Sequence, residues 1–244
     1  MKYYFFFATI LLCQSLRAQF STGLLVERAS FNNSRSVLKI ESPSKKTGYL
    51  SIKKISVPTA MVLYGFISLG SKGLKEANIE VREEILEHND QFHTNIDNYL
   101  QFVPAASVYL LNIAGVKGKN NFKNRTILFG MSTLIMAGTV FGLKKLTHQL
   151  RPDGSAYNSF PSGHTAAGFS GAEFMAQEFR SYSPWLKYSG YLMGTATGVL
   201  RIYNNKHWLA DVIAGAGIGI LSTKASYWLF EKMKRKRTNS VAVF

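Results

Sequence analysis

The sequence predicts an all-α protein with several membrane-spanning helices, and three observations support this class. No segment alternates apolar and polar residues over any length, as a half-buried strand would. The composition is 46% hydrophobic and only 18% charged, which is apolar for a soluble protein. Residues 126–143 contain no charge, and this run approaches the ~20 residues that a membrane span needs.

The remaining elements follow in chain order. Residues 57–70 are apolar but few and include Pro58, so we expect a core or interfacial helix there. Residues 74–100 have the spacing of an amphipathic helix with a break near Asn89. Further helices are expected over 102–116, 126–143, 162–179, 188–200 and 212–230. The helix from Ser162 is too polar to face lipid, and glycines in the last helix permit close packing.

The first 18 residues have the pattern of a secretory signal peptide. Lys2 precedes an apolar region, and cleavage is expected after Ala18. The only cysteine, Cys13, lies in this segment. The mature chain would therefore have no disulfide and no thiol chemistry.

The charge is large and uneven. The net charge is +15, yet half of the carboxylates fall within residues 76–97, so the rest of the chain is strongly basic. Such a balance suits anionic partners. The basic residues lie beside apolar runs and not in a nucleic-acid-binding motif with interleaved aromatic residues, which favours membrane and phosphate over nucleic acid.

The same charges predict a topology. If the leader places residue 19 outside and residues 57–70 do not cross, residues 102–116 cross inward and residues 126–143 cross outward. The basic segments at 117–125 and 232–237 then lie in the cytoplasm, as the positive-inside rule requires. A crossing by residues 57–70 would reverse this parity. The alternative is a soluble periplasmic protein, because most of the apolar runs fall short of a span.

Three clusters in the second half of the chain concentrate chemically useful residues. The first is His207 with Asp211, whose spacing places both on one face of a helix. A carboxylate there can orient the imidazole and leave its other nitrogen free to attack a substrate. Taken alone, an ordinary contact between neighbouring helix turns is the simpler interpretation.

The second cluster is Pro161-Ser162-Gly163-His164, which opens the predicted helix. Serine is a favoured N-cap, the free N–H groups at a helix start bind anions, and glycine lets a ligand approach the backbone. The simpler interpretation is a capped helix with a surface histidine.

The third cluster comprises Lys144, Arg151 and Arg201, which supply fixed positive charge. Each has a plain alternative as a membrane-interface anchor. All three clusters, however, fall at helix ends on one predicted membrane face. The histidines form no metal-ligand spacing and no nucleotide-binding glycine loop is present, so neither metal nor ATP is expected.

Together these residues resemble the type 2 phosphatidic acid phosphatase superfamily, which includes acid phosphatases and vanadium haloperoxidases. Lys144 with Arg151-Pro152 is similar to its first motif, residues 161–164 match its second in full, and Arg201, His207 and Asp211 match its third. Leu200 replaces the serine of the third motif. The resemblance covers residues 100 to 230 and implies a helical bundle of this type.

The resemblance implies a role for each matched residue. His207 would attack phosphorus, Asp211 would orient it, and His164 would protonate the leaving oxygen and then activate water. The phosphoryl oxygens would be held by Lys144, Arg151, Ser162, Gly163 and Arg201. Along the whole sequence, the expected domains are a signal peptide (1–18), an extension with the amphipathic helix (19–95), a catalytic domain (96–231) and a basic tail (232–244).

The implied activity is a metal- and cofactor-independent phosphatase acting on a phosphomonoester or pyrophosphate group, with a phosphorylated lipid as substrate. It would lie in the inner membrane with its site facing the periplasm. The alternatives are a soluble periplasmic acid phosphatase, a vanadate-dependent haloperoxidase and a phospholipid-binding or transport protein without catalysis.

Overall fold

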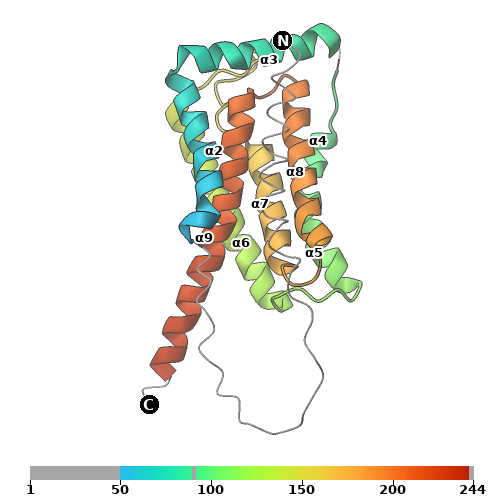
Figure 1. The fold of residues 1–244 in the computed structure, drawn as a ribbon, viewed down its shortest axis with the longest axis vertical. Helices are drawn as coiled ribbons and strands as arrows, with labels where there is room; N and C mark the ends of the chain where they lie inside the picture. Colours follow the sequence, from blue (N-terminus) through green and yellow to red (C-terminus); the bar gives the residue numbers. More distant parts are fainter. Residues whose placement is uncertain (1–49, 90–91, 242–244) are drawn as a thin grey trace, which may run out of the picture. The chain divides into compact units, whose positions relative to one another are not determined.

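The computed structural model describes residues 50–89 and 92–241, and all regular secondary structure within these residues is helical (Figure 1). The predicted signal peptide and residues 19–49 and 90–91 of the extension lie outside the described residues. The all-α prediction is confirmed. The helices are α2 (Ile52–Gly70), α3 (Lys72–Asn89), α4 (Ile96–Leu100), α5 (Val103–Ile113), α6 (Phe122–Thr147), α7 (Gly163–Glu178), α8 (Pro184–Tyr203) and α9 (Leu209–Val241).

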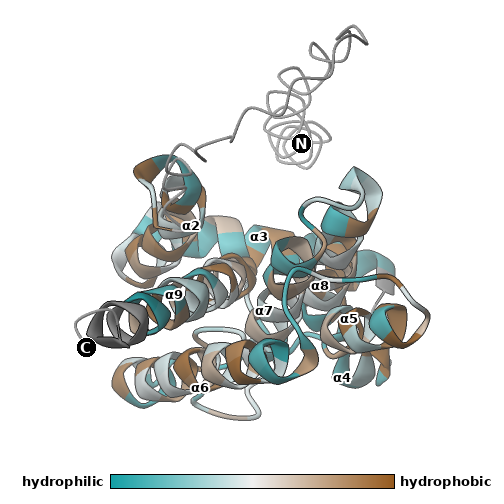
Figure 2. Ribbon diagram, turned by 90° about the horizontal axis from the view of Figure 1, so that it is seen from below, coloured by the Kyte–Doolittle hydropathy of each residue, from teal (hydrophilic) through white to brown (hydrophobic). Residues whose placement is uncertain are grey.

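The centre of the bundle is α7, which α5, α6, α8 and α9 surround (Figure 2). Most of its residues are buried, including Phe174 and Glu173. The sequence predicts this position, because a helix too polar for lipid is excluded from the outside of a membrane bundle. A 16-residue helix is about 24 Å long.

Two glycines of α9 show why this helix packs closely on α7. A Cβ on Gly219 would clash with the carbonyl of Ala166, and a Cβ on Gly215 would lie 2.5 Å from the carbonyl oxygen of Ser162. Only glycine permits these approaches of backbone to backbone. The close packing that the glycines of this segment predict is therefore confirmed.

Three helices are long and apolar enough to cross a membrane: α2, α6 and the part of α9 from Leu209 to Arg235. Their outer apolar side chains are exposed, among them Leu63, Leu134 and Phe141. Hydrocarbon tails solvate such a surface, whereas water would not. The chain is accordingly a membrane protein, and the expectation that several of its helices span is confirmed.

The structure corrects the expectation for residues 57–70. The helix begins at Ile52, has 19 residues, and includes Pro58 in its second turn, where the ring is buried. Lys53 and Lys54 concealed this start, because their charges lie in the first turn of an otherwise apolar helix. The topology argument that required this segment not to cross therefore loses its premise. At the other terminus, α9 continues through Val241, so helix extends into the predicted basic tail.

Buried ionic side chains form pairs near the C-terminal end of α7. The carboxylate of Glu178 accepts a hydrogen bond from Nε of Arg125 at 3.2 Å, and both side chains are at most 1% exposed. One turn earlier, Glu173 pairs with Lys224 at 2.7 Å. Charges inside a membrane bundle are costly unless paired. These pairs hold α6 and α9 against α7.

Candidate active site

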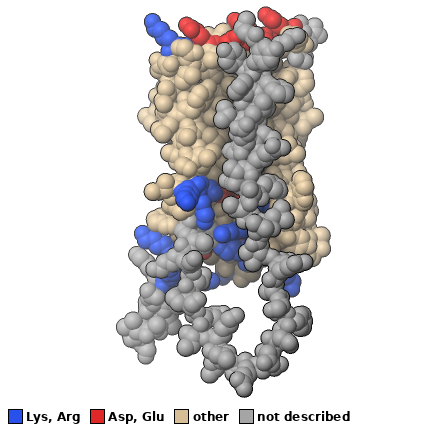
Figure 3. Space-filling model, viewed as in Figure 1, with Lys and Arg blue, Asp and Glu red and all other residues tan. Residues whose placement is uncertain are grey.

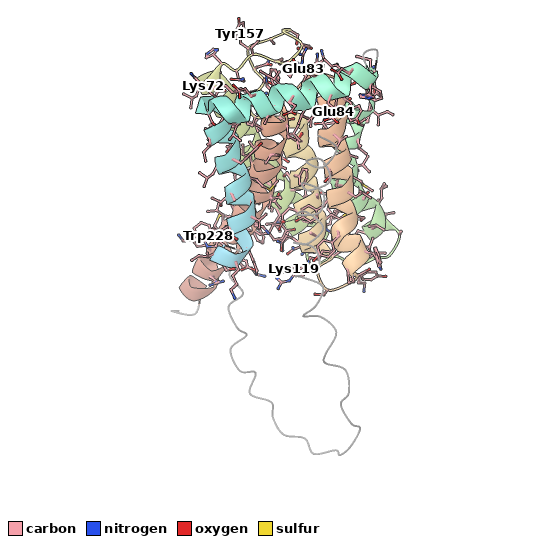
Figure 4. All side chains as sticks on the ribbon, turned by 45° about the horizontal axis from the view of Figure 1, so that its top comes forward. Lys72, Glu83, Glu84, Lys119, Tyr157 and Trp228 are labelled. Atoms are coloured by element: carbon pink, nitrogen blue, oxygen red, sulfur yellow. The ribbon has the colours of Figure 1, made fainter. Side chains whose placement is uncertain are left out.

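The predicted site residues come from different helices but meet at one end of the bundle. Lys144 lies in the last turn of α6, His164 in the first turn of α7, Arg201 near the end of α8, and Asp211 in the first turn of α9. Because α6 and α8 run opposite to α7 and α9, these ends coincide. Figure 4 places Tyr157, from the loop that joins α6 to α7, at this end and Lys119 at the other.

His207 lies against Asp211, with Nδ1 3.5 Å from Oδ2, and each side chain is 2% exposed. The prediction that one helix carries both is wrong, because α9 begins only at Leu209. The turn before it places Asn205 at a φ of 54°, which ends α8 and brings His207 back over Asp211. The same carboxylate oxygen accepts from the backbone N–H of Trp208 at 3.0 Å.

Ser159 completes this group, and the sequence analysis does not include it. Its hydroxyl donates to Oδ2 of Asp211 at 2.5 Å and lies 3.5 Å from Nδ1 of His207. It is fully buried. The only sequence signal was its position two residues before Pro161, inside a loop that had to enter the site.

Burial lowers the pKa of His207 to about 4. Asp211 opposes this change, while Lys144 and Arg201 add to it. A buried imidazole near two cations is thereby held neutral. A neutral imidazole has a free lone pair, which is the form that attacks phosphorus or carbon.

The N-terminus of α7 is hydrogen-bonded to the backbone of Asp211, the partner of this imidazole. Ser162 is its N-cap, and its hydroxyl accepts from the backbone N–H of Thr165. The backbone N–H of Ser162 donates to the carbonyl oxygen of Asp211 at 3.0 Å, which ties the start of α7 to α9. The N–H groups of Gly163 and His164, in the first turn, have no carbonyl one turn earlier in the helix. Such a terminus favours an anion.

Three cations lie around the same point. Nζ of Lys144 donates to the carbonyl oxygens of Asn158 and Ser159. Nε of Arg151 and Nε of Arg201 are buried and have no hydrogen-bond partner among the described residues. An unpartnered buried donor costs about 1–3 kcal/mol. The two donors thus fit an anionic ligand that would satisfy them.

The cations lie close enough to repel one another. Burial lowers the pKa of Arg151, and Arg201 lowers it further. Burial also lowers the pKa of His164 to about 4, with Arg201, Arg151 and Lys144 adding to the effect against Asp97. A site with this excess of positive charge attracts phosphate-like anions.

Asp97 and Asn98, on α4, are further residues that the sequence analysis does not include in the site. Asp97 pairs with Arg201 at 2.6 Å, and Asn98 lies 2.9 Å from Nε2 of His164. Lys206, in the loop between α8 and α9, pairs with Asp153, in the loop between α6 and α7, at 2.6 Å. Burial would raise the pKa of Asp153, but hydrogen bonds from Lys206 and Ser155 outweigh it and lower that pKa to about 2.

Among the residues described, no three His, Cys, Asp or Glu side chains gather as metal ligands do. Metal independence remains a prediction.

Relatives of known kind cover part of this chain. Over 159 residues it is 38% identical to a lipid A 1-phosphatase of Porphyromonas gingivalis, which covers 65% of this chain and 36% of that protein. Over 76 residues it is 37% identical to the bacitracin transport permease protein BcrC of Bacillus licheniformis, which covers 31% of this chain and 36% of that protein. The chain thus matches little more than a third of either relative's length.

The fold has a solved counterpart. The transmembrane PAP2-type phosphatidylglycerolphosphate phosphatase from Bacillus subtilis superposes with a TM-score of 0.51 at 21% identity, over 73% of this chain and 98% of that chain. At this identity the likeness shows the fold alone. A profile of the PAP2 superfamily matches residues 125–235, which include every site residue predicted from the sequence. Through this segment, the chain is similar to the PAP2 superfamily.

Proposed function

We propose that this protein is a phosphatase that hydrolyses a phosphate ester or pyrophosphate group of a lipid through a phosphohistidine. The observation that carries the proposal is the neutral, buried imidazole of His207 among three cations and a helix N-terminus. A binding site alone requires the positive charge but not an oriented, neutral imidazole. That combination suits nucleophilic attack on a tetrahedral anion.

In the proposed first step, Nε2 of His207 attacks phosphorus while Nδ1–H points to Asp211. The N–P bond forms as the bond from phosphorus to the leaving oxygen breaks, and His164 gives that oxygen a proton. In the second step, water attacks phosphorus and the N–P bond breaks. His164 takes the proton from this water, and inorganic phosphate leaves.

In this mechanism, the residues around the phosphoryl group would stabilise its negative charge. Arg151 and Arg201 have donors without partners, Lys144 is fixed by two loop carbonyls, and the first turn of α7 offers backbone N–H groups. Donors held in place before the reaction stabilise the charge that develops on the phosphoryl oxygens. Ser162 acts in this scheme through its backbone and as the cap of α7.

A lipid is the substrate class that the surroundings favour. Helices α2, α6 and α9 are long and apolar enough to span, and the site lies at their ends, where lipid head groups are found. The similarity to a lipid A 1-phosphatase supports a phosphorylated lipid, although it covers only part of that protein.

Charge supports an outward-facing site. Lys54 lies in the first turn of α2 and Lys123 in the first turn of α6, so both lie at the end opposite the site, as Lys119 does. Figure 3 shows, for one face, carboxylates gathered at the other end. By the positive-inside rule, the basic end is cytoplasmic and the site is periplasmic. This assignment does not depend on whether α2 crosses.

The test is phosphate release from a panel of lipid and soluble phosphates by the detergent-purified full chain. His207→Ala is expected to lower kcat by more than about a thousandfold, because it removes the nucleophile. His88→Ala is the matched control, since His88 is an exposed histidine on α3. Equal activity of wild type and His207→Ala would contradict the mechanism.

The alternatives give other outcomes in the same preparation. A soluble acid phosphatase would leave the membrane in a carbonate wash. A haloperoxidase would oxidise bromide when loaded with vanadate, and a non-catalytic binder would bind lipid phosphates without releasing phosphate.

A further inference from the structure

The short helix α4 reaches two candidate catalytic residues at once. Asp97 pairs with Nη1 of Arg201 on α8 at 2.6 Å, with side chains 1% and 8% exposed. The next residue, Asn98, has its Oδ1 2.9 Å from Nε2 of His164 on α7. Both α7 and α8 lie within the segment of the family match, and α4 lies outside it.

The segment that carries Asp97 is fixed to the same end of α8. The side-chain amide of Asn204 accepts from the backbone N–H of Thr94 and donates to its carbonyl oxygen, both at 2.9 Å. The rings of Phe92 and Tyr203 meet edge to face at 5.5 Å. The segment before Asp97 is thus bound to Tyr203 and Asn204, which follow Arg201 by two and three residues. These contacts fix the carboxylate of Asp97 relative to the guanidinium of Arg201.

The charges explain why Arg201 needs such a partner. Arg151 and Lys144 lie close enough to repel Arg201, and burial removes the water that would screen it. A buried carboxylate next to the guanidinium compensates this repulsion and directs its planar fork. Because Asp97 uses one N–H of Nη1, the guanidinium keeps other donors, including the buried and unpartnered Nε.

The opposite interpretation is that Asp97 occupies the place of a phosphoryl group and blocks the site. Its anchored position argues against this. Asp97 would have to leave together with a segment that a paired amide and two rings hold on α8. A blocking carboxylate would also engage the fork through both oxygens, whereas Oδ1 of Asp97 is buried without a partner.

We propose that Asp97 is a positioning residue for Arg201 and that it sets the orientation in which this arginine meets the phosphoryl group. The proposal rests on the function proposed above. It assigns a part of the site to a helix that lies outside the family match. Asn98 is the neighbouring contact, which holds the ring of His164.

The experiment is a double-mutant cycle on the full chain, with phosphate release as the readout. Asp97→Asn keeps the shape of the side chain and removes its charge. We expect kcat/KM to fall about 10- to 100-fold, as misplacement of a substrate-holding group does. In an Arg201→Ala background the same change should cost less than about twofold, because the group that Asp97 positions is gone.

Asn95→Ala is the matched control, since Asn95 is exposed on the same segment and its side chain makes no cap hydrogen bond. It should match wild type. Unchanged or faster turnover in Asp97→Asn would overturn the proposal, and so would an equal loss in both backgrounds, which a purely structural role gives.

Asp97→Glu keeps the measurement possible if Asp97→Asn does not fold. It retains the buried charge, and its longer side chain should displace the guanidinium and weaken competitive inhibition by vanadate at least about threefold. Inhibition equal to wild type would also overturn the proposal. Failure of the proposed function is separate, since the wild type would then release no more phosphate than His207→Ala.

Discussion

At the scale of single residues, the site is organised by what the cations do to two histidines. Burial alone disfavours charge on His207 and His164, and the surrounding cations add to that preference. The consequences differ. A nucleophile is most effective when neutral, whereas a general acid needs a proton. In the proposed mechanism a bound phosphoryl group would resolve this difference, because its negative charge would neutralise the cations that lower the pKa of His164.

This argument predicts that anion binding is coupled to proton uptake. The pKa of His164 is about 4 without a ligand and should rise when a dianion occupies the site. By linkage, the affinity for the anion then increases as pH falls through the raised pKa, by up to about tenfold per pH unit, and levels off below about 4. Sulfate is a suitable probe because it does not titrate near neutral pH, and its binding is measured by calorimetry.

The control for this prediction is His164→Gln, which keeps a polar side chain and cannot take up the proton. Its sulfate affinity should depend less steeply on pH than that of the wild type. If both proteins show the same slope, another group takes up the proton, and the coupling assigned to His164 is wrong.

At the scale of elements, the N-terminus of α7 joins the fold to the site. Ser162 caps the helix, and its backbone carbonyl packs directly against Gly215 of α9. Gly163, the next residue, has room for a side chain, since an added Cβ would meet only Val140 at an ordinary 3.6 Å. Packing therefore explains the glycine at 215 but not the glycine at 163. Under the proposed function, access of the phosphoryl group to the backbone would explain the latter.

Gly163→Ala should therefore separate binding from stability. A helix gains about 0.5–1 kcal/mol from alanine in place of glycine, so thermal stability should be unchanged or higher. The new methyl group would obstruct the phosphoryl oxygens, so KM should rise about tenfold. Kinetics and thermal unfolding on one preparation provide the measurement.

Gly215→Ala is the matched opposite case. Its Cβ would lie 2.5 Å from the carbonyl oxygen of Ser162, so this variant should lose both stability and activity. A Gly163→Ala enzyme with the KM of the wild type would show that phosphate does not approach this part of the backbone.

The sequence predicted those parts of the molecule that have a local signature. Helix α7 could be predicted from its cap and its polar face, and the three motifs identified residues at helix ends that the structure brings together. The pair of Asp97 with Arg201 joins residues 104 positions apart, and no periodicity relates them. Ser159 was missed for a similar reason, because a serine in a loop has no pattern until the fold places it beside Asp211.

At the scale of the whole described bundle, the chain passes along α7 several times. From the site end, α4 and α5 run along α7. This passage starts at the contact of Asn98 with His164 and ends where the backbone N–H of Lys119 donates to the carbonyl oxygen of Glu178. Helix α6 returns, with Thr147 next to Phe160. Helix α5 has only 11 residues, yet this passage is required for α6 to begin at the basic end. The number of crossings therefore cannot be counted from apolar length alone.

The orientation of α2 has a consequence for the chain before it. Gly65 packs on Ala214 near the site end and Gly217 packs on Pro58 farther along, so α2 runs opposite to α9 and Ile52 lies at the basic end. If that end is cytoplasmic, a cleaved leader that carries residue 19 outward would place the start of α2 on the wrong side. An outward-facing site and a cleaved secretory leader are therefore competing predictions unless the chain crosses once more before residue 52.

Cysteine labelling in intact spheroplasts decides between them. In a Cys13→Ser background, a cysteine replacing the exposed Ser155 reports the site end, and one replacing the exposed Lys117 reports the basic end. The positive-inside rule predicts that an impermeant maleimide reaches position 155 in intact cells and position 117 only after lysis. The opposite result would put the site in the cytoplasm. A third cysteine, replacing the exposed Ser51, should behave like position 117, because α2 begins at the basic end; labelling at both 51 and 155 in intact cells would show that α2 does not cross.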